Sequence, residues 1–169
     1  MINLAEAVKL KSILAKKVQE LVSELHRSAF VTVEKGQAPK TSNRAMKVIE
    51  AELVQVRLDV RTLDRLVYEA NILNTVDFKG EKLALVEAIE LATQLRADVE
   101  ICKQFSMHEK ESVRVGYGET TMLYEIAMYE PDDYRERAIT LEKDAHKLSN
   151  LINAKNYSVE INFDDSRYF

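Results

Sequence analysis

Residues 49–70 read IEAELVQVRLDVRTLDRLVYEA, and this stretch decides the fold. Apolar side chains recur in it at alternating intervals of four and three residues without a break, at Ile49, Leu53, Val56, Val60, Leu63, Val67 and Ala70. This spacing predicts an α-helix with one narrow apolar stripe. Such a stripe must pack against another helix, so the chain is expected to be built from paired helices.

Three further segments carry the same rhythm. The first has Leu4, Ala7, Leu14, Val18, Leu21 and Leu25, with Lys11 at one seam position. The later two have Leu85, Ala88, Ala92, Leu95, Val99 and Cys102, and Tyr134, Ala138, Leu141, Ala145, Leu148 and Ile152. Together these patterns predict a mainly α protein with coiled-coil-like seams. We expect a single helical-bundle domain over 1–169, with a long antiparallel hairpin over 2–71 and helices over about 81–110 and 132–155, arranged as a four-helix bundle.

The breaks between these segments carry turn and strand signals. Residues 36–43 are rich in Gly, Pro and short polar side chains and form the loop of the hairpin, with Ser42 or Asn43 as cap of the second helix. The segments 121–129 and 158–163 hold apolar residues in strand-like order and could pair as a small β-ribbon. The first of them could equally be one more helical turn. Asp132 and Asp133, after Pro131, suit the positive end of a helix.

Composition excludes several classes of protein. The 169 residues suit one domain of ordinary size, and a net charge of -4 gives no reason to expect tight binding to nucleic acid or to an acidic membrane. No run of apolar residues is long enough to span a membrane. Cys102 is the single cysteine, which excludes a disulfide within the chain and favours a reducing compartment, so we expect a cytoplasmic protein.

Motifs for catalysis or metal binding are absent. A dimetal carboxylate bundle needs Glu-x-x-His on two helices, but Ser23, Phe105 and Lys143 stand three residues before the histidines. The segment Gly116-Tyr117-Gly118 lacks the third glycine and the strand of a dinucleotide site, so it indicates a turn. We therefore expect no metal, no cofactor and no catalytic residues.

Two groups of polar residues remain as candidates for binding. Asn71, Asn74 and Thr75 follow the second helix, where they act as a C-terminal cap or line a polar pocket. Six of the seven tyrosines come late in the chain, and tyrosine serves both interfaces and ligand sites. The row Arg57, Arg61 and Arg65 is interpreted as a solvated face with ion pairs, rather than a surface for RNA. The candidate ligand-binding residues are Asn71, Asn74, Thr75, Arg96, Arg114, Tyr117 and Tyr124.

Several pieces of the chain resemble the septicolysin-like family of small bacterial helical proteins. They are the start Leu4-Ala5-Glu6-Ala7, the stretch from Leu63 to Asn71 with Asn74-Thr75, the Gly80…Leu83…Ala88 opening, Tyr124-Glu125-Ile126, and Asn156-Tyr157, where the family often has Asn-Trp. The resemblance implies a helical, self-associating protein with no established activity. The family name suggests a cytolysin, but this chain has no tryptophan and no membrane-length segment.

Three hypotheses about function follow. The leading one is a non-catalytic protein that associates with itself, because long helical arms leave part of a seam uncovered. The alternative is an oligomer that binds or sequesters a small anionic or nucleotide-like ligand. A cytolysin and an unrecognised enzyme are the weaker hypotheses. The expected partner is a second copy of the chain, with neither membrane nor nucleic acid favoured.

Overall fold

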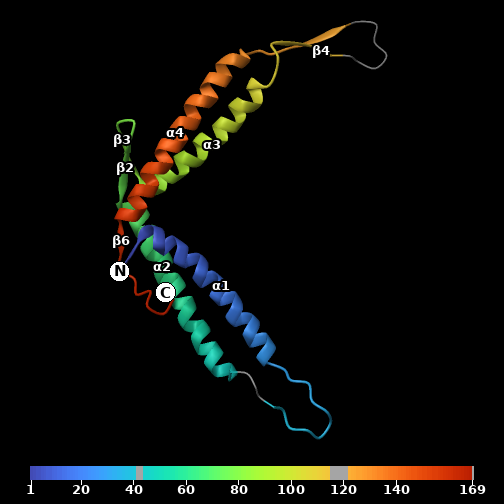
Figure 1. The fold of residues 1–169 in the computed structure, drawn as a ribbon, viewed down its shortest axis with the longest axis vertical. Helices are drawn as coiled ribbons and strands as arrows, with labels where there is room; N and C mark the ends of the chain where they lie inside the picture. The colour runs from blue at the N-terminus through green and yellow to red at the C-terminus, as the bar shows by residue number, and fades with distance from the viewer. Residues whose placement is uncertain (41–43, 115–121, 169) are drawn as a thin grey trace. The chain divides into compact units, whose positions relative to one another are not determined.

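The computed structural model describes residues 1–40, 44–114 and 122–168 (Figure 1). The described chain is mainly helical, with four helices and three small antiparallel strand pairs. It divides into two compact units, Met1–Asn74 with Lys155–Phe169, and Thr75–Ala154. We call these the first unit and the second unit.

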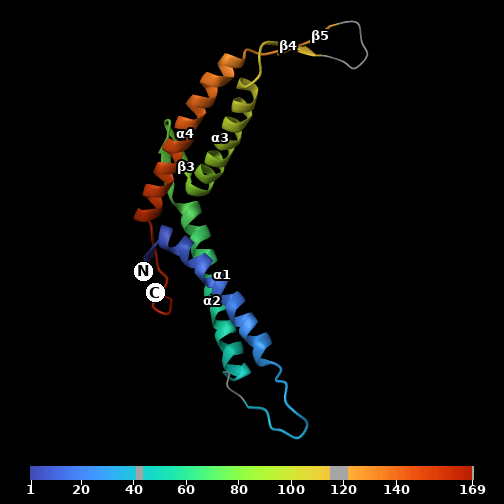
Figure 2. The same ribbon diagram turned by 45° about the vertical axis from the view of Figure 1, so that its right-hand side comes forward.

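The first unit is built on two antiparallel helices, α1 (Leu4–Ser28) and α2 (Met46–Leu73), which lie side by side in Figures 1 and 2. Helix α1 begins with a capping box, in which the Asn3 side chain accepts from the Glu6 backbone N–H at 2.8 Å and the Glu6 carboxylate accepts from the Asn3 backbone N–H at 2.9 Å. The core between the helices is made of the residues that repeat every three or four positions, namely Leu4, Ala7, Leu10, Leu14, Leu21, Ile49, Leu53, Val56, Leu63, Val67 and Ala70.

The end of the chain returns to this hairpin. Strand β6 (Glu160–Ile161) pairs with β1 (Ile2–Asn3), and the Leu4 N–H donates to the Val159 carbonyl at 2.8 Å. Alternate residues of the returning segment are buried, namely Val159, Ile161 and Phe163. The period of two places these three side chains on the hairpin side of an extended chain.

Charged residues along the edges of α1 and α2 add ion pairs to the seam. Lys17 lies 3.1 Å from Glu52, Arg44 bonds Glu52 and also lies 3.4 Å from Glu24, and Lys11 lies 2.6 Å from Asp64. The hydrogen bond from Arg44, and then that from Lys17, lowers the pKa of the Glu52 carboxyl below its usual value.

The second unit begins with a β-hairpin. Strands β2 (Thr75–Phe78) and β3 (Glu81–Ala84) pair with Val76 opposite Leu83, and both of these side chains are buried. The two turn residues, Lys79 and Gly80, have φ of 52° and 84°. Positive φ at both positions is the conformation that two-residue hairpin turns require. The Lys79 ammonium also bonds the buried Asp144 carboxylate of α4.

Helices α3 (Leu85–Ser106) and α4 (Pro131–Ser158) run side by side (Figures 1 and 2). Arg96 donates to the Ser149 hydroxyl at 2.6 Å, and Lys103 lies 3.1 Å from Glu142. Asp132 and Asp133 occupy the first turn of α4, as the sequence indicates. The buried side chains of the pair are Leu85, Ala88, Ala92, Val99, Cys102, Ala138, Ala145, Leu148 and Ile152.

Beyond α3, strands β4 (Glu111–Arg114) and β5 (Leu123–Ile126) form a ribbon in which every residue is exposed. Val113 faces Tyr124 and Glu111 faces Ile126, so these four side chains share one face. Next to the ribbon, Phe105, Tyr129 and Tyr134 pack with ring centroids 5.0 to 5.2 Å apart.

The expected pairing of 121–129 with 158–163 is wrong. Strand β5 pairs with β4, and β6 pairs with β1. Helix α4 lies between the two segments, and its 28 residues separate its ends by about 40 Å, so strands at those ends cannot meet.

The expected bounds of two helices also need correction. The third helix begins at Leu85 rather than 81, because 81–84 complete the β-hairpin, and it ends at Ser106. The fourth runs from Pro131 to Ser158, three residues past the expected end. The expected caps Ser42 and Asn43, and the turn at Gly116–Gly118, lie outside the described residues.

Candidate functional site

The C-terminal segment covers one side of the α1–α2 hairpin. The Tyr168 hydroxyl donates to Asp59 Oδ2 at 2.5 Å, and the Arg167 guanidinium lies 3.9 Å from the same oxygen. Burial, and then the hydrogen bond to this carboxylate, raises the pKa of the Tyr168 hydroxyl above its ordinary value. The hydroxyl therefore keeps its proton and acts as a donor. Arg167 and Tyr168 face a hollow lined by Ile13, Lys17, Glu52, Gln55 and Val56.

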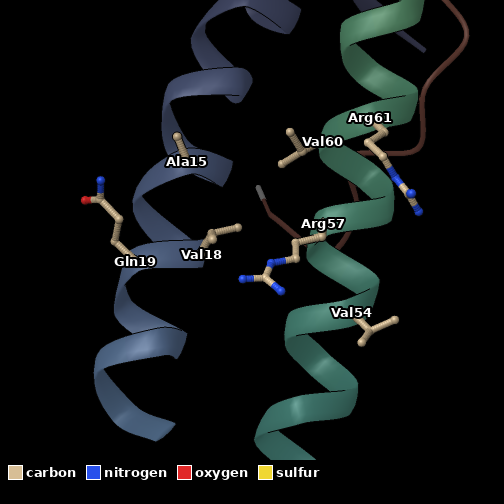
Figure 3. Close-up of a pocket in the computed structure, with 7 residues that line it drawn as sticks. All are labelled: Ala15, Val18, Gln19, Val54, Arg57, Val60 and Arg61. Atoms are coloured by element: carbon tan, nitrogen blue, oxygen red, sulfur yellow. The ribbon is translucent and has the colours of Figure 1, made fainter. Parts of the chain in front are cut away.

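The other side of the hairpin is open. It carries a groove of about 590 Å³ along the two helices, which we call the open groove (Figure 3). Its lining is Ala15, Val18 and Gln19 from α1, and Val54, Arg57, Val60 and Arg61 from α2. Figure 3 shows Val18 and Val60 pointing toward each other between the helices, while Arg57 reaches into the gap. The groove therefore has an apolar floor and a cationic rim.

The groove exists because α2 carries a second stripe beside its buried seam. Glu50, Val54, Arg57 and Arg61 follow one another at intervals of four, three and four residues, which places them on one face of the helix. All four are exposed, and 67% of Val54 is accessible to solvent. An isolated valine on a surface is ordinary, but here it adjoins the apolar groove floor.

The charges of this second stripe have no partners in the described chain. No carboxylate of 1–40, 44–114 or 122–168 pairs with Arg57 or Arg61, and no cation of those ranges pairs with Glu50. Arg65, the next in the row, pairs with Glu69 of its own helix at 2.6 Å. The second stripe thus offers two guanidinium groups and one carboxylate to whatever contacts it.

The ligand-binding residues predicted from the sequence are dispersed over several elements. Asn71 is half-buried in α2, while Asn74 is the C-cap of that helix, and its side-chain amide donates to the Ala70 carbonyl at 2.9 Å. Thr75 begins β2. These positions follow one another along the chain, and the Asn74 amide is used by the helix end.

The remaining predicted residues belong to α3 and the ribbon. Arg96 lies within α3, bonded to Ser149, and ten residues of helix, or about 15 Å, separate it from the end of α3. Arg114 and Tyr124 share the ribbon, where Arg114 lies 2.8 Å from Glu125. Tyr117 lies outside the described residues. The structure therefore brings Arg114 and Tyr124 onto one ribbon and leaves Arg96 apart from them.

The row of arginines on α2 was recognisable in the sequence, whereas the groove beside it was not. The expected ion pairs from this row to a neighbouring helix are not present among the described residues, where Arg65 pairs within α2. The available signal was the interval pattern of Glu50, Val54, Arg57 and Arg61, which repeats the seam rhythm on another face.

The described residues form neither a metal-binding cluster nor a membrane-spanning helix. In ranges 1–40, 44–114 and 122–168, no three His, Cys, Asp or Glu side chains gather in a way that could hold a metal ion. None of the described helices combines the length and the apolar character needed to cross a bilayer.

These features define a mainly α-helical protein built from helical hairpins with short strand pairs. No known family and no curated protein matches the chain. A solved structure is similar, the crystal structure of a functionally unknown conserved protein from Corynebacterium diphtheriae. It is 18% identical in sequence, with a TM-score of 0.63, and the match covers 95% of this chain and 98% of that chain. The similarity is one of fold.

Proposed function

We propose that this protein is a non-catalytic, self-associating helical protein, in which two copies pack through the face of the α1–α2 hairpin that carries the open groove. The two hairpins then form one four-helix bundle. The observation that carries this proposal is the apolar floor of the open groove, with Val54 exposed beside it. A second copy offers a surface of the same apolar character.

Two helices in contact cover one stripe each, so any second apolar stripe stays in water. Packing a second layer of helices on that stripe removes apolar area from water, at about 25 cal/mol per Å². Small Ala15 permits close approach of the partner backbone, as at other helix contacts. Closed two-fold dimers are the commonest solution for an exposed self-complementary face.

Placing a charge at Val54 should therefore break the association. We expect V54E to raise the dimer dissociation constant on the order of tenfold or more, because the glutamate would be buried at the centre of the contact without a partner. Helix content should stay unchanged, since Val54 is exposed in the single chain. Sedimentation velocity over a concentration series measures the dissociation constant, and circular dichroism measures the helix content.

The matched control is V48E, in the same helix. Val48 is also exposed, but six residues of helix turn it to a different side of α2 from Val54. The V48E variant should therefore dimerise like the unmodified chain. A monomeric unmodified chain at micromolar concentration, or equal dimerisation of both variants, would contradict the proposal.

A second candidate function is the binding of a small anionic ligand in the open groove. Arg57 and Arg61 favour it, because neither has a carboxylate partner in the described chain and guanidinium groups suit phosphate and carboxylate groups. We expect a nucleotide that binds in the open groove to raise the melting temperature of the chain. The variant R57Q/R61Q should abolish that shift. A thermal-shift panel of nucleotides and inorganic phosphate, with mass spectrometry of any ligand released on unfolding, checks this. No shift and no released ligand would exclude it.

The proposed location is the cytoplasm. Cys102 is free and buried on α3, and a lone unpaired thiol suits a reducing compartment.

A further inference from the structure

The order of charges on the exposed stripe of α2 distinguishes between ways of pairing two copies. Glu50 and Arg57 lie seven residues apart, or about 10 Å along the helix, with Val54 between them. Both side chains are exposed, and neither has an oppositely charged partner in the described chain. Two turns of helix bring them to nearly the same face, the one that carries the open groove.

A parallel arrangement of two α2 helices would place Glu50 against Glu50 and Arg57 against Arg57. Like charges in register are destabilising. An antiparallel arrangement about a two-fold axis has a different consequence, because if one residue contacts a second, the second also contacts the first. An axis beside Val54 sets Glu50 of each copy opposite Arg57 of the other, so two equal ion pairs form at once.

We infer that the dimer is antiparallel and two-fold, with Val54 at its axis and reciprocal Glu50–Arg57 ion pairs on either side. This inference rests on the proposed self-association through the face of the hairpin that carries the open groove, and it adds the register of that contact. Helices in contact lie about 8 to 10 Å apart, a distance that extended Glu and Arg side chains bridge. Valine at the axis makes the central contact apolar, and the flanking pairs select the register.

Charge reversal tests the register. We expect E50R and R57E each to raise the dimer dissociation constant about tenfold or more, because each creates two like-charge contacts. The double variant E50R/R57E restores both pairs with the charges exchanged, so its dissociation constant should return to within about threefold of the unmodified value. Both sites are exposed, and circular dichroism confirms that every variant folds.

A mixture of the two single variants gives a sharper readout. At positions 50 and 57 the E50R chain carries two arginines and the R57E chain carries two glutamates, so a heterodimer has two correct pairs and either homodimer has none. Native mass spectrometry of an equal mixture should show mainly heterodimer.

The matched control for the double variant E50R/R57E is E50R/R61E, which has the same charge changes. In the inferred register Arg61 faces Met46 rather than a charge, so this variant should stay weakly dimeric.

The outcomes separate this inference from the proposal beneath it. A monomeric unmodified chain would overturn both. A dimer that V54E disrupts, but in which E50R/R57E fails to recover and the mixture shows no preference for heterodimer, would overturn the register alone. Recovery of E50R/R61E to the same extent as E50R/R57E would also overturn it, because net charge rather than pairing would then explain the effect.

Discussion

Replacing Phe163 by alanine is expected to lower the free energy of unfolding of the first unit by about 3 to 5 kcal/mol. Phe163 is 7% exposed and follows β6 in the segment that returns to the α1–α2 hairpin. Its ring occupies space that an alanine leaves partly empty, so the loss includes a cavity term as well as the lost burial. Val159 and Ile161 in the same segment are buried too, which limits how far the segment can move to fill the gap.

The control for this prediction is the same substitution at Phe30. That ring is 88% exposed, so F30A should change the free energy of unfolding by less than about 0.5 kcal/mol. Urea unfolding followed by circular dichroism, at one fixed protein concentration, measures both values. If F163A and F30A unfolded at the same urea concentration, the returning segment would contribute little to the core.

Leu63 to alanine is the second large effect, with an expected loss of about 3 kcal/mol. Leu63 is fully buried near the middle of the seam between α1 and α2. Alanine keeps the helix intact, since its helix propensity is the higher of the two, so the loss reports packing rather than helix formation. The neighbouring seam residues belong to two rigid helices and cannot close the cavity completely.

Leu73 at the end of α2 provides the comparison for Leu63. It is 79% exposed, and L73A removes the same atoms from a solvated position. The same urea titration should separate the two variants clearly. Equal stability of L63A and L73A would mean that the seam does not hold the hairpin together.

The seams themselves were predictable from the intervals between apolar residues. In α2, six of the seven predicted seam residues are buried, and Val60 is half-buried because it lines the open groove. In α1 the strict heptad was less accurate, because it put Lys11 on the seam and missed the fully buried Leu10. A straight helix has 3.6 residues per turn, so the contact drifts off a seven-residue repeat, and Lys11 lies at the edge where it pairs with Asp64.

The strand pairings could not be predicted from the intervals between apolar residues. The three pairs join two to four residues each, and such short strands carry no selective pattern. The length of α4 would have excluded the pairing of 121–129 with 158–163, since that helix holds its flanking segments apart. The β2–β3 hairpin was missed because its turn uses Lys79 and Gly80 in place of the usual Asn-Gly signal.

The candidate site shows the same division between local and long-range information. The row of arginines on α2 was visible in the sequence, and so was the carboxylate of Glu50 in the same stripe. That the row borders an apolar groove was not visible, because the groove also needs Ala15 and Val18 of α1 at the same level. The C-terminal segment, which covers the other side, comes from the far end of the chain.

The sequence by itself determined that this protein is made of paired helices, because helix formation and seam position depend on residues only three or four places apart. Only the tertiary structure decided which side of the α1–α2 hairpin stays open. That choice depends on where β6 and Tyr168 dock, and contacts between residues more than a hundred positions apart leave no periodic signal in the chain. The open groove is therefore a property of the fold, although every side chain that lines it was present in the sequence.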